Sequence, residues 1–239
     1  MTRRFLFEGT AFGVSSYKLM LYLGCVAGFY AGAQMARAAG MPEIRWILAA
    51  TALLAVALAG ARLLYLRAHP GPMWHRDAGG AALYGGLLAS LFVSIPVLDA
   101  ARLPFWRFWD AASITMLTGL IFTRVGCAMN GCCAGRPTGG PLGFLLPDHR
   151  GEVWRRYPAQ LLEAAWGGVV LAAVVLLSRP SSPGGVLFAQ VRAGYGAGRF
   201  VLEQLREESR VRRFNTALSA ALALGGAAAA MLWSWRPAS

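Results

Sequence analysis

The sequence predicts an all-α integral membrane protein of about seven transmembrane helices, which form a bundle with a polar cavity at the membrane interface. Apolar residues make up 56% of the 239 residues and charged residues only 14%, against about 25% charged residues in a soluble domain. Apolar runs of about 18 or more residues recur along the whole chain, and each can cross a hydrocarbon core of about 30 Å. The runs are rich in Gly and Ala, which favours close helix packing in lipid.

The expected spans follow one another along the whole chain. They lie at about 16–36, 46–66, 80–98, 108–128, 159–178, 184–203 and 215–234. A cleaved signal peptide is disfavoured, because the first run continues to Met35 and six comparable runs follow. No linker divides the chain, so residues 1–239 are expected to form a single polytopic membrane domain. The longest connection, 130–158, is predicted to be a loop rich in Gly, Pro and Arg, and such loops are often functional.

The net charge of +12 comes almost entirely from arginine, since Lys18 is the single lysine. The sequence contains no basic helix or recognised motif for nucleic acid, so no nucleic-acid partner is predicted. Contact with anionic membrane lipid fits the charge better. Twelve of the arginines outside the spans fall on the side of the N-terminus and six on the other side. The positive-inside rule then places the N-terminus in the cytoplasm.

Six ionisable side chains lie within the predicted spans. A charge at mid-bilayer costs at least about 2.5–3.5 kcal/mol, so such residues usually face the bundle interior, a partner or a site. Two of the six, near predicted helix ends, could instead extend to the headgroups. The set is Arg62, Arg124, Glu163, Arg192, Arg199 and Glu203, of which Arg62 and Glu203 are the two near the ends.

The segment YGAGRFVLEQLRE places Tyr195, Arg199 and Glu203 at i, i+4 and i+8 on one helical face. Arg199 and Glu203 can therefore pair directly. An arginine that is partly neutralised but keeps free donors suits a phosphate group, which it can bind through two parallel hydrogen bonds. The alternative is a salt bridge between helices with no ligand.

The segment TRVGCAMNGCCAG ends the fourth span with Arg124 and then supplies Asn130 and three glycines, which permit tight turns. Non-helical backbone at this depth is tolerated only where it is buried in protein or lines a wet cavity. The simplest function of such a cavity is to bind a lipid headgroup.

Three cysteines, Cys127, Cys132 and Cys133, cluster in the same segment. With the distant His149 they could bind a metal ion, but the spacing C-x4-C-C is not a usual zinc pattern. Thiol–disulfide exchange lacks the usual C-x-x-C motif. A cysteine could also accept a covalent group, or all three could be small residues in a tight turn. We predict no metal ion and no other cofactor.

These segments resemble the prolipoprotein diacylglyceryl transferases, seven-helix enzymes of the bacterial inner (plasma) membrane. TRVGCAMNGCCAG is similar to the family signature G-R-x-G-N-F-x-N-x-E-x-x-G, YPAQLLE to H-P-x-Q-L-Y-E, and YGAGRFVLEQLRE to Y-G-x-x-R-F-x-x-E-x-x-R. YKLMLYLG, GARLLY and YGGLLAS resemble further family segments. The residues that match include Tyr17, Gly85, Gly86, Arg124, Gly126, Asn130, Gly135, Gln160, Glu163, Tyr195, Arg199, Glu203 and Arg206.

The resemblance implies a reaction in which a diacylglyceryl group moves from phosphatidylglycerol to the lipobox cysteine of a prolipoprotein, next to its signal peptide. It also implies catalysis on the outer side of the membrane, with the N-terminus outside. We expect this orientation rather than the one from the arginine count, because arginines that bind anionic lipid would distort that count. The implied catalytic residues are Arg124, Arg199, Glu203 and Tyr84, and Tyr84 stands where the family has histidine. The implied substrate-binding residues are Tyr17, Gly85, Gly86, Asn130, Gly135, Gln160, Glu163 and Tyr195.

The chain departs from the family pattern at positions that handle protons or hydrogen bonds. Tyr84 and Tyr157 stand at histidine positions, Cys127 at an asparagine and Cys132 at a glutamate. A phenol with a pKa near 10 is a poor base at neutral pH. Two alternatives therefore remain open: a paralogue that uses the same anionic lipid with another acceptor, and a non-catalytic protein that binds or transports lipid.

Overall fold

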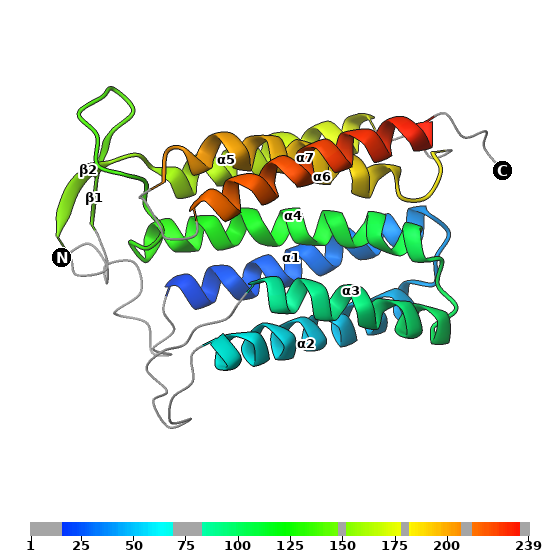
Figure 1. Cartoon of the computed structure of the whole chain (residues 1–239). Helices are drawn as coiled ribbons and strands as arrows, with labels where there is room; N and C mark the ends of the chain where they lie inside the picture. Colours follow the sequence, from blue (N-terminus) through cyan, green and yellow to red (C-terminus); the bar gives the residue numbers. More distant parts are fainter. Residues whose placement is uncertain (1–15, 69–82, 148–151, 178–181, 207–211, 235–239) are drawn as a thin grey trace. The chain divides into compact units, whose positions relative to one another are not determined.

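The computed structural model of the chain describes residues 16–68, 83–147, 152–177, 182–206 and 212–234 (Figure 1). Seven helices occupy this part of the chain, which confirms the predicted all-α class, and each begins and ends within a few residues of its predicted bounds. They are α1 (Ser16–Ala38), α2 (Glu43–Ala68), α3 (Leu83–Ala100), α4 (Phe105–Met129), α5 (Ala159–Leu177), α6 (Val186–Glu203) and α7 (Arg212–Ser234).

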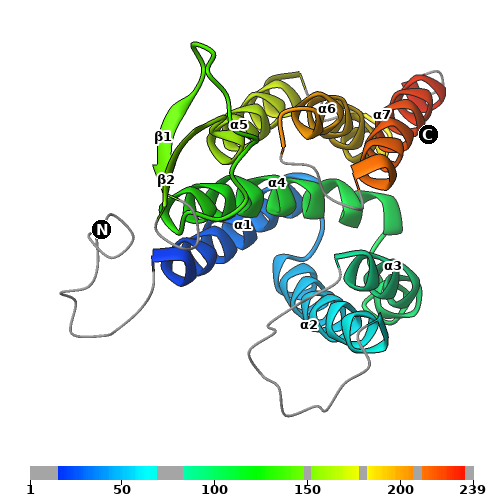
Figure 2. The ribbon, with the colours of Figure 1, turned by 60° about the vertical axis from the view of Figure 1, so that its left-hand side comes forward.

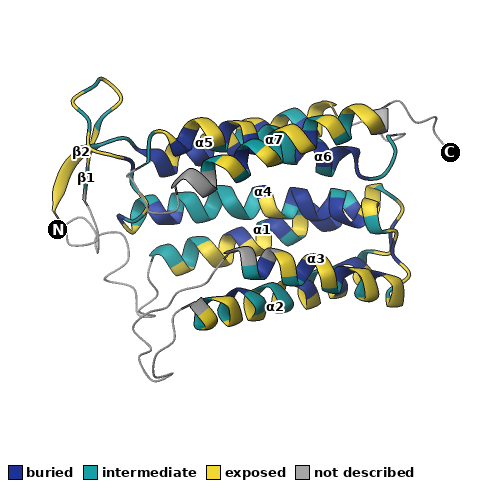
Figure 3. Ribbon diagram, viewed as in Figure 1, coloured by how far each residue is buried: buried dark blue, intermediate teal, exposed yellow. Residues whose placement is uncertain are grey.

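Four of these helices are long and apolar enough to cross a membrane: α1, α2, α4 and α5. Within α3 and α7 the apolar stretches are shorter, at Leu88–Ala100 and Thr216–Leu232. Helix α6 carries Arg192 and Arg199 inside its length, which explains its lower apolar character. Many large apolar side chains on the helices are exposed, as the yellow faces in Figure 3 show. Such surfaces are expected to contact lipid, since soluble proteins rarely expose contiguous apolar faces of this kind.

The chain forms two compact units whose boundaries fall within α1 and α4. One unit comprises Met1–Gly32 and Asp110–Ser239, and the other comprises Ala33–Trp109. That the whole chain behaves as a single membrane domain with an interfacial polar cavity stays a prediction.

In the unit Ala33–Trp109, helices α2 and α3 pack closely against each other. A Cβ atom at Gly60 would overlap Ala89 and lie 2.6 Å from the carbonyl oxygen of Gly85, so both positions need glycine for the backbones to approach. In the same unit, Trp46 of α2 and Phe108 of α4 are both fully buried, with ring centroids 5.8 Å apart. Because lipid is as apolar as leucine, such close packing holds membrane helices together.

The Gly60→Ala variant is expected to lower the free energy of unfolding by about 1–3 kcal/mol, because the added methyl group forces α2 and α3 apart. The midpoint of thermal unfolding in detergent would report the loss. The control is Gly168→Ala in α5, where nothing lies within 4 Å of an added Cβ atom. The packing assignment fails if the two variants unfold alike.

In the other unit, α5, α6 and α7 lie side by side (Figures 1 and 2). Glycines on both partners let the backbones of α6 and α7 touch: a Cβ atom at Gly196 would meet the amide nitrogen of Ala223 at 2.6 Å, and one at Gly226 would meet the carbonyl oxygen of Ala189 at 2.7 Å. The Trp166 indole of α5 donates to the carbonyl oxygen of Gly194 in α6 at 2.9 Å.

The start of α6 is capped by a residue of α4. The Asp110 carboxylate accepts hydrogen bonds from the backbone amides of Gly185 and Phe188, each at 2.7 Å. These amides belong to the first turn, where helix donors have no partner within the helix, and a carboxylate there also complements the positive end of the helix dipole. Asp110 thereby fixes the register of α6, which carries Tyr195, Arg199 and Glu203.

The predicted loop 130–158 contains a β-hairpin that the sequence analysis missed. Strands β1 (Phe144–Pro147) and β2 (Val153–Arg156) pair antiparallel, with Phe144 opposite Arg156. The hairpin stands beside the start of α5 in Figure 2. The Arg155 side chain donates to the carbonyl oxygens of Gly143 and Gly140 at 3.2 and 3.3 Å and so closes the preceding turn. The segment is therefore folded onto itself in large part.

Candidate functional site

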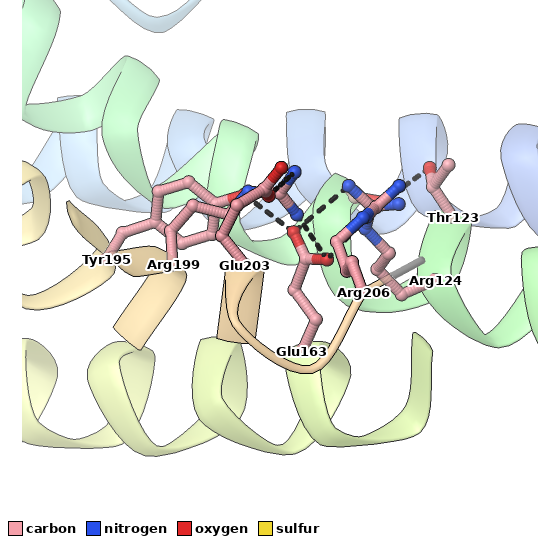
Figure 4. A network of polar contacts seen from close by, with 8 residues as sticks. Thr123, Arg124, Glu163, Tyr195, Arg199, Glu203 and Arg206 are labelled. Atoms are coloured by element: carbon pink, nitrogen blue, oxygen red, sulfur yellow. Dashed lines mark hydrogen bonds and ion pairs between the residues drawn. The ribbon is translucent and has the colours of Figure 1, made fainter. Parts of the chain in front are cut away.

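The centre of the site is Glu163, a carboxylate on α5 whose side chain is 1% exposed. Its Oε1 accepts a hydrogen bond from the Tyr195 hydroxyl at 2.7 Å and lies 3.0 Å from Nη2 of Arg124. Its Oε2 accepts from Nη1 of Arg199 at 2.8 Å and lies 3.7 Å from Nη1 of Arg206. Figure 4 shows these side chains converging from α4, α5, α6 and the segment after α6.

A second carboxylate, Glu203, pairs with Arg199 one helical turn away, with 2.8 Å between its Oε2 and Nη2 of Arg199. This ion pair confirms the shared helical face predicted for Tyr195, Arg199 and Glu203. Both carboxylates are buried, whereas the side chains of Arg124, Arg199 and Arg206 keep 16–22% of their surface. The accessible side of the cluster is therefore the cationic side.

Three guanidinium groups against two carboxylates leave one positive charge in excess. Each guanidinium has five N–H donors, more than its contacts to the two carboxylates use. The carboxylates hold the arginines in place, which lowers the conformational cost of binding an anion. The arrangement suits a phosphate group, which arginine can bind through two parallel hydrogen bonds.

A crossing of three backbone segments positions the arginines. The amide of Gly135 donates to the carbonyl oxygen of Tyr157 at 2.9 Å, and the amide of Arg136 donates to that of Leu205 at 2.9 Å. A Cβ atom at Gly135 would lie 2.7 Å from the carbonyl oxygen of Leu205. Gly135 thus allows the end of the α4 turn to lie directly on the segment that carries Arg206. A direct contact of Gly135 with substrate stays a prediction.

The turn after α4 is a Schellman motif. The amide of Gly131 donates to the carbonyl oxygen of Ala128 at 3.2 Å, and the amide of Cys132 donates to that of Cys127 at 3.1 Å. Gly131 has φ 66°, the left-handed conformation that ends many helices. This motif folds the residue after the glycine back over the last helical turn, and so brings Cys132 to Cys127.

Cys133 completes a cluster of three thiols. Its φ of 60° is unusual for a residue with a side chain, and the three Sγ atoms lie within 4.8 Å of one another. The neighbouring Cys127 and Cys132 thiols, and after them the charges of Arg206 and Arg124, lower the pKa of the Cys133 thiol. The Cys132 thiol itself donates to the carbonyl oxygen of Cys127 at 3.6 Å.

Gln160 links the thiol cluster to the arginine cluster. It lies one turn before Glu163 on α5, is 2% exposed, and donates from Nε2 to the carbonyl oxygen of Cys132 at 2.6 Å. Its Oε1 is buried and accepts no hydrogen bond from a residue that the structure describes. The two clusters therefore belong to one site.

The other predicted site residues that the structure describes lie on α1, on α3 and at the end of α4. Tyr17 lies half-buried on α1, and its ring would be 3.5 Å from a Cβ atom at Gly126 of α4. Asn130 follows the last residue of α4, and its backbone amide donates to the carbonyl oxygen of Gly126 at 2.9 Å. The glycines at 85 and 86 belong to the unit Ala33–Trp109 and pack against α2. The Tyr84 side chain and His149 lie outside the described residues.

Two residues of this site were not predicted as site residues. Arg206 lies beyond the end of α6 and contacts Glu163 from there. Its spacing of seven residues from Arg199, which is typical of one helical face, is the signal that could have identified it. Asp110, the cap of α6, lies inside an apolar run. An acidic residue in such a run is itself a signal of a specific partner.

The chain matches the profile of the family described as prolipoprotein diacylglyceryl transferase over residues 4–234. It is 33% identical over 163 residues to the phosphatidylglycerol--prolipoprotein diacylglyceryl transferase of Bordetella parapertussis, a match that covers 67% of this chain and 60% of that protein. The protein of the same description from Geobacter sulfurreducens is 33% identical over 146 residues, with 61% and 55% covered.

A longer match is to the phosphatidylglycerol--prolipoprotein diacylglyceryl transferase of Nitratidesulfovibrio vulgaris, strain Miyazaki F. It is 31% identical over 202 residues, which cover 80% of this chain and 76% of that protein. The matches to the Bordetella and Geobacter proteins thus span less than two thirds of those proteins.

Proposed function

The chain belongs to the prolipoprotein diacylglyceryl transferase family, and we propose that it transfers a diacylglyceryl group from phosphatidylglycerol to the lipobox cysteine of a prolipoprotein. It is a multi-pass membrane protein, since four of its helices can cross a membrane. We place it in the bacterial inner membrane. The observation that carries the proposal is the cluster of three arginines around the buried Glu163, and the names of its relatives supply the substrates.

The reaction is a displacement at an sp³ carbon. The acceptor thiol loses its proton, its sulfur forms a bond to the glycerol carbon of the lipid, and the carbon–oxygen bond to the phosphate breaks. The diacylglyceryl group ends on sulfur as a thioether, and glycerol phosphate leaves. Preorganised positive charge at the leaving phosphate is the kind of electrostatic stabilisation that lowers such a barrier most.

Arg124 and Arg199 are assigned to the phosphate, because each has an ion-paired guanidinium with an accessible side. Glu203 orients Arg199, and Glu163 orients both arginines. Tyr195 donates to Glu163 and fixes the position of that carboxylate. Tyr84, which stands at the histidine position of the family, would accept the proton of the acceptor thiol.

The remaining substrate-binding assignments concern the lipid headgroup and its surroundings. Tyr17, Asn130 and Gly135 lie at or beside the turn after α4 and would shape the headgroup site. Gln160 offers its unpaired Oε1 to a polar group of the substrate. The glycines at 85 and 86 pack against the backbone of α2, so their contact with substrate stays a prediction from the family resemblance. A paralogue that uses the same lipid with a different acceptor would keep the arginine cluster unchanged.

The proposal is tested by a transfer assay with the purified full chain, labelled phosphatidylglycerol in mixed micelles and a lipobox peptide. We expect mass spectrometry to find a diacylglyceryl thioether on the peptide cysteine. A peptide with serine in place of that cysteine is the matched control and should gain no adduct. If the protein binds the lipid but leaves the cysteine peptide unmodified, the proposed acceptor is wrong.

A further inference from the structure

The three thiols at the end of α4 form a second candidate site beside the arginines. We propose that Cys127, Cys132 and Cys133 bind a soft divalent metal ion as three thiolates, with Zn²⁺ as the preferred ion. Their Sγ atoms already lie within 4.8 Å of one another. Tetrahedral zinc with Zn–S bonds of about 2.3 Å needs sulfur atoms about 3.8 Å apart. Each sulfur therefore has to move by less than about 1 Å, which a rotation about χ1 can supply.

The turn builds this cluster from a spacing that no ordinary zinc motif has. The left-handed conformation of Gly131 returns Cys132 to Cys127, and the left-handed conformation of Cys133 brings the third sulfur to the other two. A residue with a side chain rarely adopts this conformation, and such backbone strain tends to occur at functional sites. The backbone thus holds the three sulfurs together before any ion arrives.

The surroundings suit the charge of such a site. Binding of Zn²⁺ by three thiols releases three protons and leaves one negative charge on the complex. Arg206 and Arg124 interact electrostatically with Cys133 and would balance that charge. Gln160 holds the carbonyl oxygen of Cys132 at 2.6 Å and so orients the backbone of a ligand, as partners outside the ligand set commonly do.

The chemistry of the donors selects the ion. Thiolates prefer Zn²⁺ and Cu⁺ over Mg²⁺ and Ca²⁺, which take oxygen ligands. Three protein ligands leave the fourth tetrahedral position open, as in catalytic zinc sites. This further role rests on the proposed function: the open position would take the sulfur of the acceptor thiol, whose proton would be released to water as the sulfur binds the metal. The metal ion would then favour the thiolate form of the acceptor, which a phenol at Tyr84 generates poorly because it is a weak base at neutral pH.

The test uses the reduced full chain in detergent, without lipid or peptide, titrated with Zn²⁺ alone and with Co²⁺ as the absorption probe. We expect one Zn²⁺ per chain and thiolate-to-cobalt charge-transfer bands. Serine at Cys127, Cys132 or Cys133 should weaken binding by more than the roughly 10- to 100-fold that loss of an outer partner costs. Cys25→Ser is the matched control, since Cys25 is an exposed cysteine of α1, and should bind like the parent.

Thiol counting before the titration makes each outcome decisive. Four free thiols per chain together with one tightly bound Zn²⁺ support the site. Thermal unfolding of each serine variant shows whether the variant is still folded, so that a loss of Zn²⁺ binding can be assigned to the missing ligand. Four free thiols without bound Zn²⁺, or binding that survives replacement of all three cysteines, overturn it. A count of two free thiols in the protein as purified, before reduction, means a disulfide, which also overturns it. None of these readouts depends on transfer activity, so failure of the transfer assay leaves the metal site standing.

Discussion

The Arg199→Ala variant is expected to lose transfer activity by about 100- to 1,000-fold, the usual effect of removing one preorganised donor to a developing negative charge. Nη1 and Nη2 of Arg199 each hold a buried carboxylate at 2.8 Å, so the guanidinium cannot turn away from its position. Its accessible edge remains for the phosphate. Initial rates of thioether formation on the lipobox peptide, followed by mass spectrometry, measure the loss.

The Arg199→Lys variant separates charge from geometry. It keeps the positive charge but cannot make two parallel hydrogen bonds to a phosphate, so we expect activity between that of the parent and that of the alanine variant. Helical content and membrane insertion should be the same in all three proteins. If the alanine variant transfers within about threefold of the parent rate, less than the effect of one lost donor, Arg199 does not contact the leaving phosphate.

The Glu163→Gln variant is expected to lose about 3–5 kcal/mol of stability, the cost of removing one partner from a buried ion pair. Glu163 is 1% exposed and its carboxylate contacts Arg124, Arg199 and Arg206. Glutamine keeps the shape and one acceptor for the Tyr195 hydroxyl but removes the charge that balances the guanidinium groups. The midpoint of thermal unfolding in detergent, with and without phosphatidylglycerol, measures the change.

The control for this variant is Glu152→Gln, an exposed carboxylate beside β2 whose Oε2 accepts from the Trp154 indole at 3.2 Å. Surface substitutions of this kind usually change stability by less than about 0.5 kcal/mol. Added phosphatidylglycerol should recover part of the stability of the Glu163→Gln variant, because its phosphate supplies negative charge to the same arginines. Equal unfolding midpoints for both variants would contradict the central role of Glu163.

The helices could be predicted because their signal is local. Each apolar run contains its own information, and the ends of α5 and α6 were placed within one or two residues. The hairpin β1–β2 was missed for the same reason: four-residue strands between glycines and arginines carry little periodic signal. The division into two compact units could not be predicted from the sequence either, because it depends on which helices contact each other.

The site was predicted where its geometry is helical and missed where it is not. Arg199 and Glu203 pair because both lie on α6. The central position of Glu163 depends on four separate segments, so its sequence context indicates only that it needs a partner. The thiol cluster depends on φ at Gly131 and Cys133. A spacing of C-x4-C-C contains no information about those angles, so the sequence shows three cysteines in one segment but not that their sulfur atoms lie together.

At Gly135, main-chain hydrogen bonds join the segment after α4, the segment before α5 and the segment after α6. A change in the backbone of one of these segments therefore shifts the other two. Substitutions there would act on Arg124, Glu163 and Arg206 together, and their effects would not add to those of changes in the cluster itself. On the hairpin, Leu145 and Trp154 have exposed side chains on opposite faces, and substitutions there leave the main-chain hydrogen bonds of the crossing in place. Directed evolution toward a new acceptor would therefore find independent, additive steps on the hairpin and strong epistasis at the crossing.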